Sequence, residues 1–511
     1  MKQSVVMYPM LLCLYPVLFL YSQNIHEVEL SQIYLPSAVV LGFTAVFLLT
    51  LGRILKNGKK ASLIVTIFLV LFFSYGHVLT YMEDLQIKFL KDQNWLLFLW
   101  FIILVVGIWI VLRIRGDLSF IMRILWVSTF SLLVISTFNI VSFQIKESGK
   151  SRASTAAEVE EKFSPIRMEQ PRDIYYIILD AYASSETLNN VYHFNNHEFI
   201  DYLVGKGFYV ASQSRSNYGV TFLSLASSLN MEYLDSSLSN IDINNSKDRT
   251  IPYRLISENK VATYLKQHGY SFINFGSGWA GTETITSADM NVKIGGYNEF
   301  MMVLINSTAL TYFNNCILKR QARLRIQNIF SGLSGSQEMK GPKFIFAHIT
   351  CPHPPYLFTK NGDTPKETKL QMEGHREWAK RKLYLGQLQY INKQVKVMLE
   401  KILAQSGVQP IIILQADHGS ASIGRPHPPL DLTDKKIVDS INERMGILNA
   451  YYLPGVGTTS LYPSITPVNT FRMIFNLYFH NDLLLLEDRN YYGDYDTPYI
   501  LTDVTEAVVK N

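Results

Sequence analysis

Polar side chains with metal-binding chemistry stand at three points in the C-terminal two thirds of the chain. Asp180 directly follows one apolar run, Asp417 and His418 follow another, and Thr221 stands at the expected start of a helix. Carboxylate oxygens and an imidazole are ligands that divalent cations such as zinc or manganese accept. If the fold brings these four residues together, the sequence predicts a metal site.

A threonine hydroxyl beside such a cation is a usable nucleophile, because the metal lowers its pKa. The N-terminus of a helix adds backbone N–H donors that suit an anionic ester. Each residue also has a plainer explanation. Asp180 could form a turn, Thr221 could cap its helix, and Asp417-His418-Gly419 could be an ordinary corner after a strand. Their occurrence together, in this order, favours the metal site.

From Asp173 onwards, short apolar runs alternate with amphipathic segments. The expected strands are Ile174–Leu179, Phe208–Ala211, Ser271–Phe275, Phe344–Ile349, Pro410–Gln415 and Ile447–Leu453. The expected helices are Glu198–Gly205, Thr221–Met231, Pro252–His268, Tyr384–Ile402 and Val468–Tyr478. This alternation predicts an α/β domain with a mostly parallel central sheet, in which chemistry gathers beyond the carboxyl ends of the strands. Residues 276–340 fit the alternation poorly and predict an insertion.

The first 143 residues have a different composition. The chain is 48% hydrophobic and 17% charged, whereas ordinary globular chains carry about 25% charged residues. Five apolar stretches without Asp, Glu, Lys or Arg have about the length needed to cross a bilayer as helices. They are Val5–Tyr21, Ile33–Leu51, Ala61–Tyr81, Trp95–Leu112 and Ile124–Phe143. We therefore expect a transmembrane domain over 1–143, a polar linker over 144–170 and a large domain over 171–511.

Basic residues in the loops predict the orientation, because Lys and Arg stay on the cytoplasmic side. They gather between the second and third stretches and between the fourth and fifth: Arg53, Lys56, Lys59, Lys60, Arg113, Arg115 and Arg123. With five spans, the N-terminus is cytoplasmic and the large domain extracytoplasmic, as in a multi-pass protein of the plasma (inner) membrane. The spans hold no carboxylate, Lys or Arg, which favours anchoring over transport. The large domain lacks the basic excess expected of nucleic-acid binding.

The ordered set Asp180, Thr221 and Asp417-His418-Gly419 resembles the alkaline phosphatase superfamily, especially its sulfatase-like membrane branch. That branch includes lipoteichoic acid synthases and phosphoethanolamine transferases, which look similar in layout: five spans followed by an extracytoplasmic α/β domain. The resemblance implies that Asp180, Thr221, Asp417 and His418 bind the metal and that Thr221 forms a covalent phospho-enzyme. Those two kinds of enzyme use glutamate where this chain has Asp180.

Two histidine segments extend the resemblance. The sequence FAHITCPHPPY is similar to the family's substrate-side histidine motif, which matches His353; His348 is more simply a strand-end histidine bonded to the backbone. The sequence GRPHPP supplies His427. The resemblance implies that His353 and His427 bind a phosphate, protonate the leaving group or hold a second metal. Cys316 and Cys351 could form a disulfide outside the cytoplasm, but their spacing does not decide it.

These observations predict a membrane-anchored, metal-dependent phosphotransferase or phosphodiesterase that acts on lipid-linked or cell-envelope glycan substrates. Thr221 would act in a double displacement. Two alternatives stay open: hydrolysis of sulfate esters, and a non-catalytic domain that binds envelope polymers. The C/S-x-P-x-R motif of classical sulfatases does not occur around Thr221. The sequence names neither the donor, the acceptor, the metal nor the oligomeric state.

Overall fold

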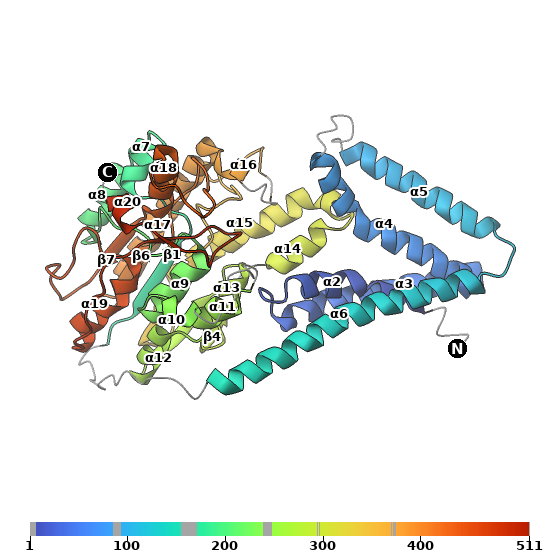
Figure 1. The fold of residues 1–511 in the computed structure, drawn as a ribbon, viewed down its shortest axis with the longest axis horizontal. Coiled ribbons are helices and arrows are strands. Elements are labelled where there is room, and N and C mark those ends of the chain that lie inside the picture. Colours follow the sequence, from blue (N-terminus) through green and yellow to red (C-terminus); the bar gives the residue numbers. More distant parts are fainter. Residues whose placement is uncertain are drawn as a thin grey trace. The chain divides into compact units, whose positions relative to one another are not determined.

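The computed structural model describes residues 7–84, 93–154, 171–238, 248–293, 295, 297–368, 370 and 375–509. The chain forms two compact units (Figure 1). The first comprises Met1–Glu160 and Tyr297–Leu318, and the second comprises Glu161–Gly296 and Lys319–Asn511. A short internal segment therefore packs with the N-terminal helices, although it lies between two parts of the second unit in the sequence.

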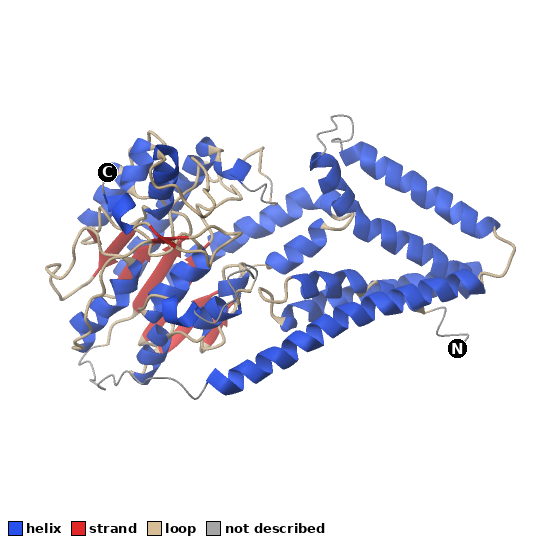
Figure 2. Ribbon diagram, viewed as in Figure 1, coloured by secondary structure: helices blue, strands red, loops and turns tan. Residues whose placement is uncertain are grey.

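The second unit is built on a seven-stranded sheet (Figure 2). Its strands are β1 (Ile174–Leu179), β2 (Tyr209–Val210), β3 (Ser271–Phe275), β4 (Met290–Val292), β5 (Lys343–Ile349), β6 (Ile411–Gln415) and β7 (Asn449–Tyr452). Their order is β2-β7-β6-β1-β5-β3-β4, and only β7 runs antiparallel to its neighbours. The predicted α/β domain with a mostly parallel sheet is confirmed.

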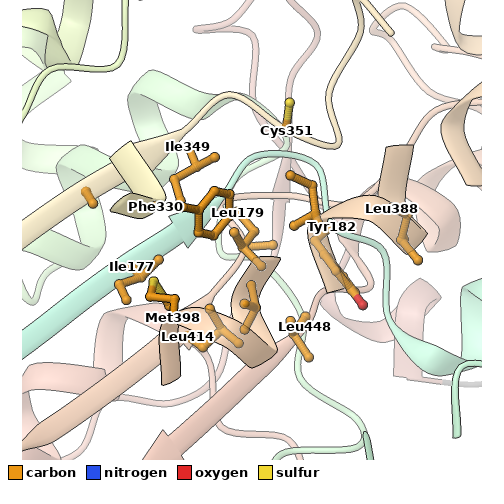
Figure 3. Packing of buried hydrophobic residues seen from close by; sticks show 14 of the residues in the cluster. Ile177, Leu179, Tyr182, Phe330, Ile349, Cys351, Leu388, Met398, Leu414 and Leu448 are labelled. Carbon is orange, nitrogen blue, oxygen red and sulfur yellow. The ribbon is translucent and has the colours of Figure 1, made fainter. Parts of the chain in front are cut away.

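The central strand β1 is buried on both faces, because every residue in it is apolar. Successive side chains point to opposite faces. Ile177 and Leu179 pack with Leu388 and Met398 from a long helix on one side (Figure 3). Tyr176 and its even-numbered neighbours pack into the core on the other side. Two apolar layers therefore fix the position of β1, and with it the position of the residue that follows.

Helices and a small hairpin complete the second unit. Its elements are α7 (Ser185–Asn190), α8 (His197–Gly205), α9 (Thr221–Asn230), α10 (Asp235–Leu238), α11 (Thr250–Ser257), α12 (Lys260–Gln267), α13 (Ala280–Glu283), η3 (Ser336–Glu338), α16 (His375–Trp378), α17 (Arg381–Gln405), α18 (Lys435–Met445), α19 (Pro467–Phe479), β8 (Tyr491–Tyr492), β9 (Thr502–Asp503) and α20 (Thr505–Val509). The helix α17 is the long helix that packs on β1, and α9 contributes to the opposite core.

In the described part of the first unit, four helices are long and apolar enough to cross a membrane. They lie within η1 (Leu30–Ile33) and α3 (Tyr34–Leu55), α4 (Gly58–Asp84), α5 (Gln93–Arg113) and α6 (Ser119–Ser154). The sequence predicted five spans. The first stretch instead forms two short helices, α1 (Tyr8–Leu12) and α2 (Tyr15–Gln23). Each has a proline in its first turn, and a proline there starts a new helix rather than continuing the one before it.

Both short helices pack against the longer elements of the first unit. Tyr8 of α1 packs with Leu63 and Met122, near the starts of α4 and α6. Tyr21 of α2 packs with Ile33, at the start of α3. The first predicted span is therefore not found as a membrane-crossing helix among the described residues, where its stretch forms a broken pair of short helices. Val5 and Val6 lie outside the described residues.

Candidate active site

The carboxyl ends of three neighbouring strands bring a cluster of ionisable side chains together. Asp180 follows β1, His348 is the penultimate residue of β5, and Asp417 lies two residues beyond β6. Because β1 pairs in parallel with both β5 and β6, the three residues meet at one edge of the sheet. One possible ligand atom from each lies within 4.8 Å of the other two.

The unbonded atoms of this cluster fit a cation. Asp180 Oδ1, His348 Nε2 and Asp417 Oδ2 are buried, and none has a hydrogen-bond partner in the described structure. A buried polar atom without a partner costs about 1–3 kcal/mol, and more if it is charged. Two carboxylates and an imidazole are a donor set that zinc or manganese accepts. The residues present therefore fit a divalent metal ion.

The electrostatics of the site agree with this fit. Burial and the charge of Asp180 raise the pKa of Asp417 to about 7. Burial also acts to raise the pKa of Asp180, but the neighbouring histidines outweigh it and hold that pKa below its usual range. Burial lowers the pKa of His353 and His418, which leaves their imidazoles neutral. Two crowded carboxylates beside neutral imidazoles are suited to a positive charge between them.

Thr221 and His418 complete the group that the sequence predicted. Thr221 opens α9, and its Oγ1 lies 3.1 Å from His418 Nε2. The same nitrogen lies 3.2 Å from Asp417 Oδ2 and 3.7 Å from Asp180 Oδ1. His418 Nδ1 is 2.9 Å from the carbonyl oxygen of Gly419, so Nδ1 carries the proton and Nε2 offers its lone pair to the site. The four side chains named from the sequence lie together.

Of the other three histidines singled out in the sequence, two lie near the cluster and one lies apart from it. His348 does not make the backbone bond expected of it: its Nδ1 lies 2.9 Å from Thr282 Oγ1, and its Nε2 lies 3.4 Å from Asp180 Oδ2. The ring of His353 is 6.2 Å from that of His418, between centroids. His427 stands apart, because its side chain is 58% exposed and pairs with Asp494.

Two arginines at the site were missed from the sequence. Arg444 Nε and Nη1 donate to the carbonyl oxygens of Gly219 and Gly419, at 2.7 and 3.2 Å. Those carbonyls lie close in sequence to Thr221 and His418. Arg425 Nε is buried without a hydrogen-bond partner in the described structure. The only sequence signal was the position of Arg425 in GRPHPP, two residues before His427.

The two guanidinium groups face the same aromatic ring. Their central carbons lie 5.0 Å (Arg425) and 5.5 Å (Arg444) from the ring centroid of Trp378, which also contacts His353 edge-on. Burial lowers the pKa of both arginines, that of Arg444 to about 9. Within the described residues, neither forms an ion pair with a carboxylate. Positive charge without a carboxylate partner, on the buried Arg444 and the half-buried Arg425, suits an anionic ligand.

Cys351 is a buried, free thiol in the structure. The side chain of Cys316, the partner that the sequence left open, lies outside the described residues.

An α/β domain with a buried Asp-His-Asp group at the carboxyl ends of its central strands is a candidate metal-binding domain, and the comparison with protein families identifies its family. The family model described as Sulfatase matches residues 172–471, which is more than half of the chain. The chain therefore belongs to the sulfatase family. No curated protein matches the chain.

Several solved structures resemble the second unit. The C-terminal periplasmic domain of EptC from Escherichia coli, in complex with Zn, is 14% identical, with a TM-score of 0.44 over 67% of this chain and 96% of that one. The corresponding domain of the phosphoethanolamine transferase EptC from Campylobacter jejuni is 12% identical, with a TM-score of 0.38 over 64% and 94%. A putative sulfatase, yidJ from Bacteroides fragilis, is 13% identical, with a TM-score of 0.38 over 66% and 84%. Because these sequence identities and TM-scores are low, family membership rests on the family model alone.

Proposed function

We propose that this protein is a membrane-anchored, metal-dependent phosphotransferase or phosphodiesterase that acts on lipid-linked or cell-envelope glycan substrates. The observation that carries the proposal is the contact between Thr221 Oγ1 and His418 Nε2, 3.1 Å apart, beside three buried ligand atoms without hydrogen-bond partners. A hydroxyl at the start of a helix and next to a cation site is placed as a nucleophile for an anionic ester.

In this proposal, Asp180, His348, Asp417 and His418 hold the metal, with Thr221 beside it. When bound, the cation would lower the pKa of the threonine hydroxyl and offset the negative charge that develops on the transferred group. Zinc and manganese both suit the donor set. The four residues are supplied by three strand ends, so little rearrangement is needed to bind the ion.

The reaction proceeds in two displacements. Thr221 Oγ1 attacks phosphorus, the P–O bond to the leaving alcohol breaks, and the threonine proton ends on that alcohol. An acceptor alcohol or water then attacks the phosphothreonine, and its proton returns to Thr221. We assign the transfer of these protons to His353, whose burial keeps its imidazole neutral.

The guanidinium groups of Arg425 and Arg444 support an anionic substrate. Arg444 bonds to the carbonyls beside Thr221 and His418, and Arg425 carries an Nε without a partner in the described structure. Phosphoryl transfer depends mainly on positioning and on stabilising negative charge. These two arginines would bind the peripheral oxygens of the transferred group.

Hydrolysis of sulfate esters is the second candidate, because the family model carries that description. The residues around Thr221 read NYGVTFLSLASS and offer no Cys or Ser in the C/S-x-P-x-R pattern. An unmodified threonine is therefore the nucleophile in both candidates. Paired assays with p-nitrophenyl phosphate, bis-p-nitrophenyl phosphate and p-nitrophenyl sulfate separate them.

An extracytoplasmic location for the large domain is part of the proposal. The basic loops at residues 53–60 and 113–123 favour the cytoplasmic side. In this proposal the chain crosses once more, through the apolar helix α6, before the large domain begins. That argument does not depend on whether α1 and α2 cross the membrane, so the broken first span affects only the side on which the N-terminus lies.

Replacing the nucleophile tests the proposal. Thr221→Ala should lower turnover of the phosphate ester by about 10³-fold or more, because no group remains to carry the phosphoryl intermediate. Thr221→Ser keeps a hydroxyl and should retain part of the activity. Turnover and metal content are measured on the full-length protein. A metal-loaded Thr221→Ala variant with wild-type turnover would refute the proposed function.

A further inference from the structure

Residues Tyr297–Leu318 lie inside the stretch that matches the sulfatase family, yet they belong to the unit formed by the N-terminal helices. They form α14 (Glu299–Asn306), a turn over 307–310 and the beginning of α15 (Thr311–Gly335). The sequence predicted only an insertion in this region.

The turn is bonded to the backbone of α4. Gly76 N donates to Ser307 O at 3.1 Å, and Ala309 N donates to Phe72 O at 2.8 Å. In a regular α-helix the amide of residue 76 pairs with the carbonyl of residue 72. The turn therefore bonds to the amide and to the carbonyl that would otherwise pair with each other within α4. In a bilayer, every backbone polar group needs a protein partner, so such bonds are strongly held.

Gly76 allows this close approach. A Cβ atom added at that position would lie 2.0 Å from the carbonyl oxygen of Asn306 and 2.7 Å from atoms of the Ser307 backbone. No side chain fits there unless the turn moves. The contact is specific to this glycine: a Cβ atom at Gly42 of α3 meets nothing within 4 Å.

Side chains on both arms fix the segment further. Asn298 Nδ2 donates to Gln32 Oε1 at 2.9 Å, and Tyr312 Oη donates to Asn94 Oδ1 at 2.6 Å. Phe300 of α14 packs into the apolar cluster of α2. The segment thus contacts η1 and the beginning of α5 as well as α4.

The turn lies well inside the membrane-crossing part of α4. The apolar span of that helix runs from Gly58 to Met82. Gly76 and Phe72 precede its end by six and ten residues, or about 9 and 15 Å at 1.5 Å per residue. That depth lies within the roughly 30 Å hydrocarbon core of a bilayer.

Apart from Glu299 at the start of α14, the exposed side chains that the structure describes in this segment are apolar. Val303 and Leu310 are each 46% exposed, Phe313 is 63% exposed and Ile317 is 53% exposed. The helices α3, α5 and α6, in the same unit, also expose most of their apolar surface, as lipid-facing helices do. These side chains continue that surface.

We propose that Tyr297–Leu318 is a re-entrant hairpin that enters the lipid bilayer beside α4 and returns to the same side, as a second membrane anchor of the sulfatase-family domain. Acyl chains cover Val303, Leu310, Phe313 and Ile317. This inference is independent of the proposed catalytic activity.

Depth-dependent quenching in vesicles tests the hairpin. The full-length protein carrying Cys316→Ser and one new cysteine is labelled with the fluorophore NBD and reconstituted into phosphatidylcholine vesicles with doxyl-labelled acyl chains. The label at Phe313→Cys should be quenched to within about twofold of the label at Ile135→Cys, which is exposed on α6. A label at Val408→Cys, exposed on the second unit, is the unquenched control. Labelling of the protein without a new cysteine gives the background from Cys13 and Cys351.

A matched pair of glycine variants completes the test. Gly76→Ala should displace the turn and lower the quenching at Phe313→Cys, whereas Gly42→Ala should leave it unchanged. Quenching at Phe313→Cys no greater than at Val408→Cys would overturn the proposal. So would weak quenching that rises on dilution of the protein in the vesicles, because a second copy, and not lipid, would then cover this surface at higher protein density. Turnover plays no part in either readout.

Discussion

Arg444, which is buried, and Arg425, which is half-buried, give the site a positive charge, and neither forms an ion pair with a described carboxylate. Arg425→Gln should therefore weaken inhibition by inorganic phosphate about 10- to 100-fold, since a hydrogen bond to a charged group contributes about 1.5–3 kcal/mol. Arg425→Lys keeps the charge, so its inhibition by phosphate should lie between that of the wild-type protein and that of Arg425→Gln. Arg489→Gln, at an exposed arginine paired with Glu487, serves as the control. Unchanged inhibition in Arg425→Gln at normal metal content would exclude an anion-binding role for Arg425 and would leave the nucleophile test untouched.

At the same scale, the sequence predicted Asp180, Asp417 and His418 because these residues follow apolar runs expected to be buried strands and occur together in this order with Thr221. It did not predict His348, because FAHITCPHPPY offers two histidines and the strand register decides which one faces Asp180. Arg444 could not be found at all. Its place beside Thr221 follows from the way α18 ends against the loop after β6, and no local pattern encodes that contact.

Among the elements, the junction between the loop after β6 and the end of α18 positions the site. A Cβ atom on Gly419 would lie 2.3 Å from the carbonyl oxygen of Glu443 and 2.6 Å from that of Gly446. Gly419→Ala should therefore destabilise the domain by about 1–3 kcal/mol, as overpacking does. The expected result is a fall of at least about 2 °C in melting temperature. Gly407→Ala meets no atom within 4 Å and is the control; equal melting temperatures would contradict the close packing.

The strands and helices of the sheet were predictable because their apolar runs are long and continuous. The hairpin α14–α15 was not, because α14 has only 8 residues and a span needs about 17–25. The break between α1 and α2 was likewise hidden within one continuous apolar stretch. The prolines of YPMLL and YPVLF were the only residues in that stretch that indicated a break between two helices.

For the whole molecule, binding of the metal should stabilise the folded state, because three buried ligand atoms lack partners without it. Zinc at one hundred times its Kd would add about 2.7 kcal/mol to the free energy of unfolding. A chelator should lower the melting temperature of the full-length protein, and His348→Ala should reduce that difference. An equal effect of the chelator on both proteins would show that His348 does not bind the ion.

The hairpin within the second half of the chain also bears on how the sulfatase-family domain could be isolated. A recombinant fragment starting at Pro171 would keep Val303, Leu310 and Phe313 but lose α2 and α4, the helices against which the hairpin packs. Because the apolar side chains of the hairpin would then be exposed to water, such a fragment would aggregate or bind detergent. Deleting the hairpin should yield a monodisperse sample in gel filtration, whereas choosing a different first residue for the fragment should not.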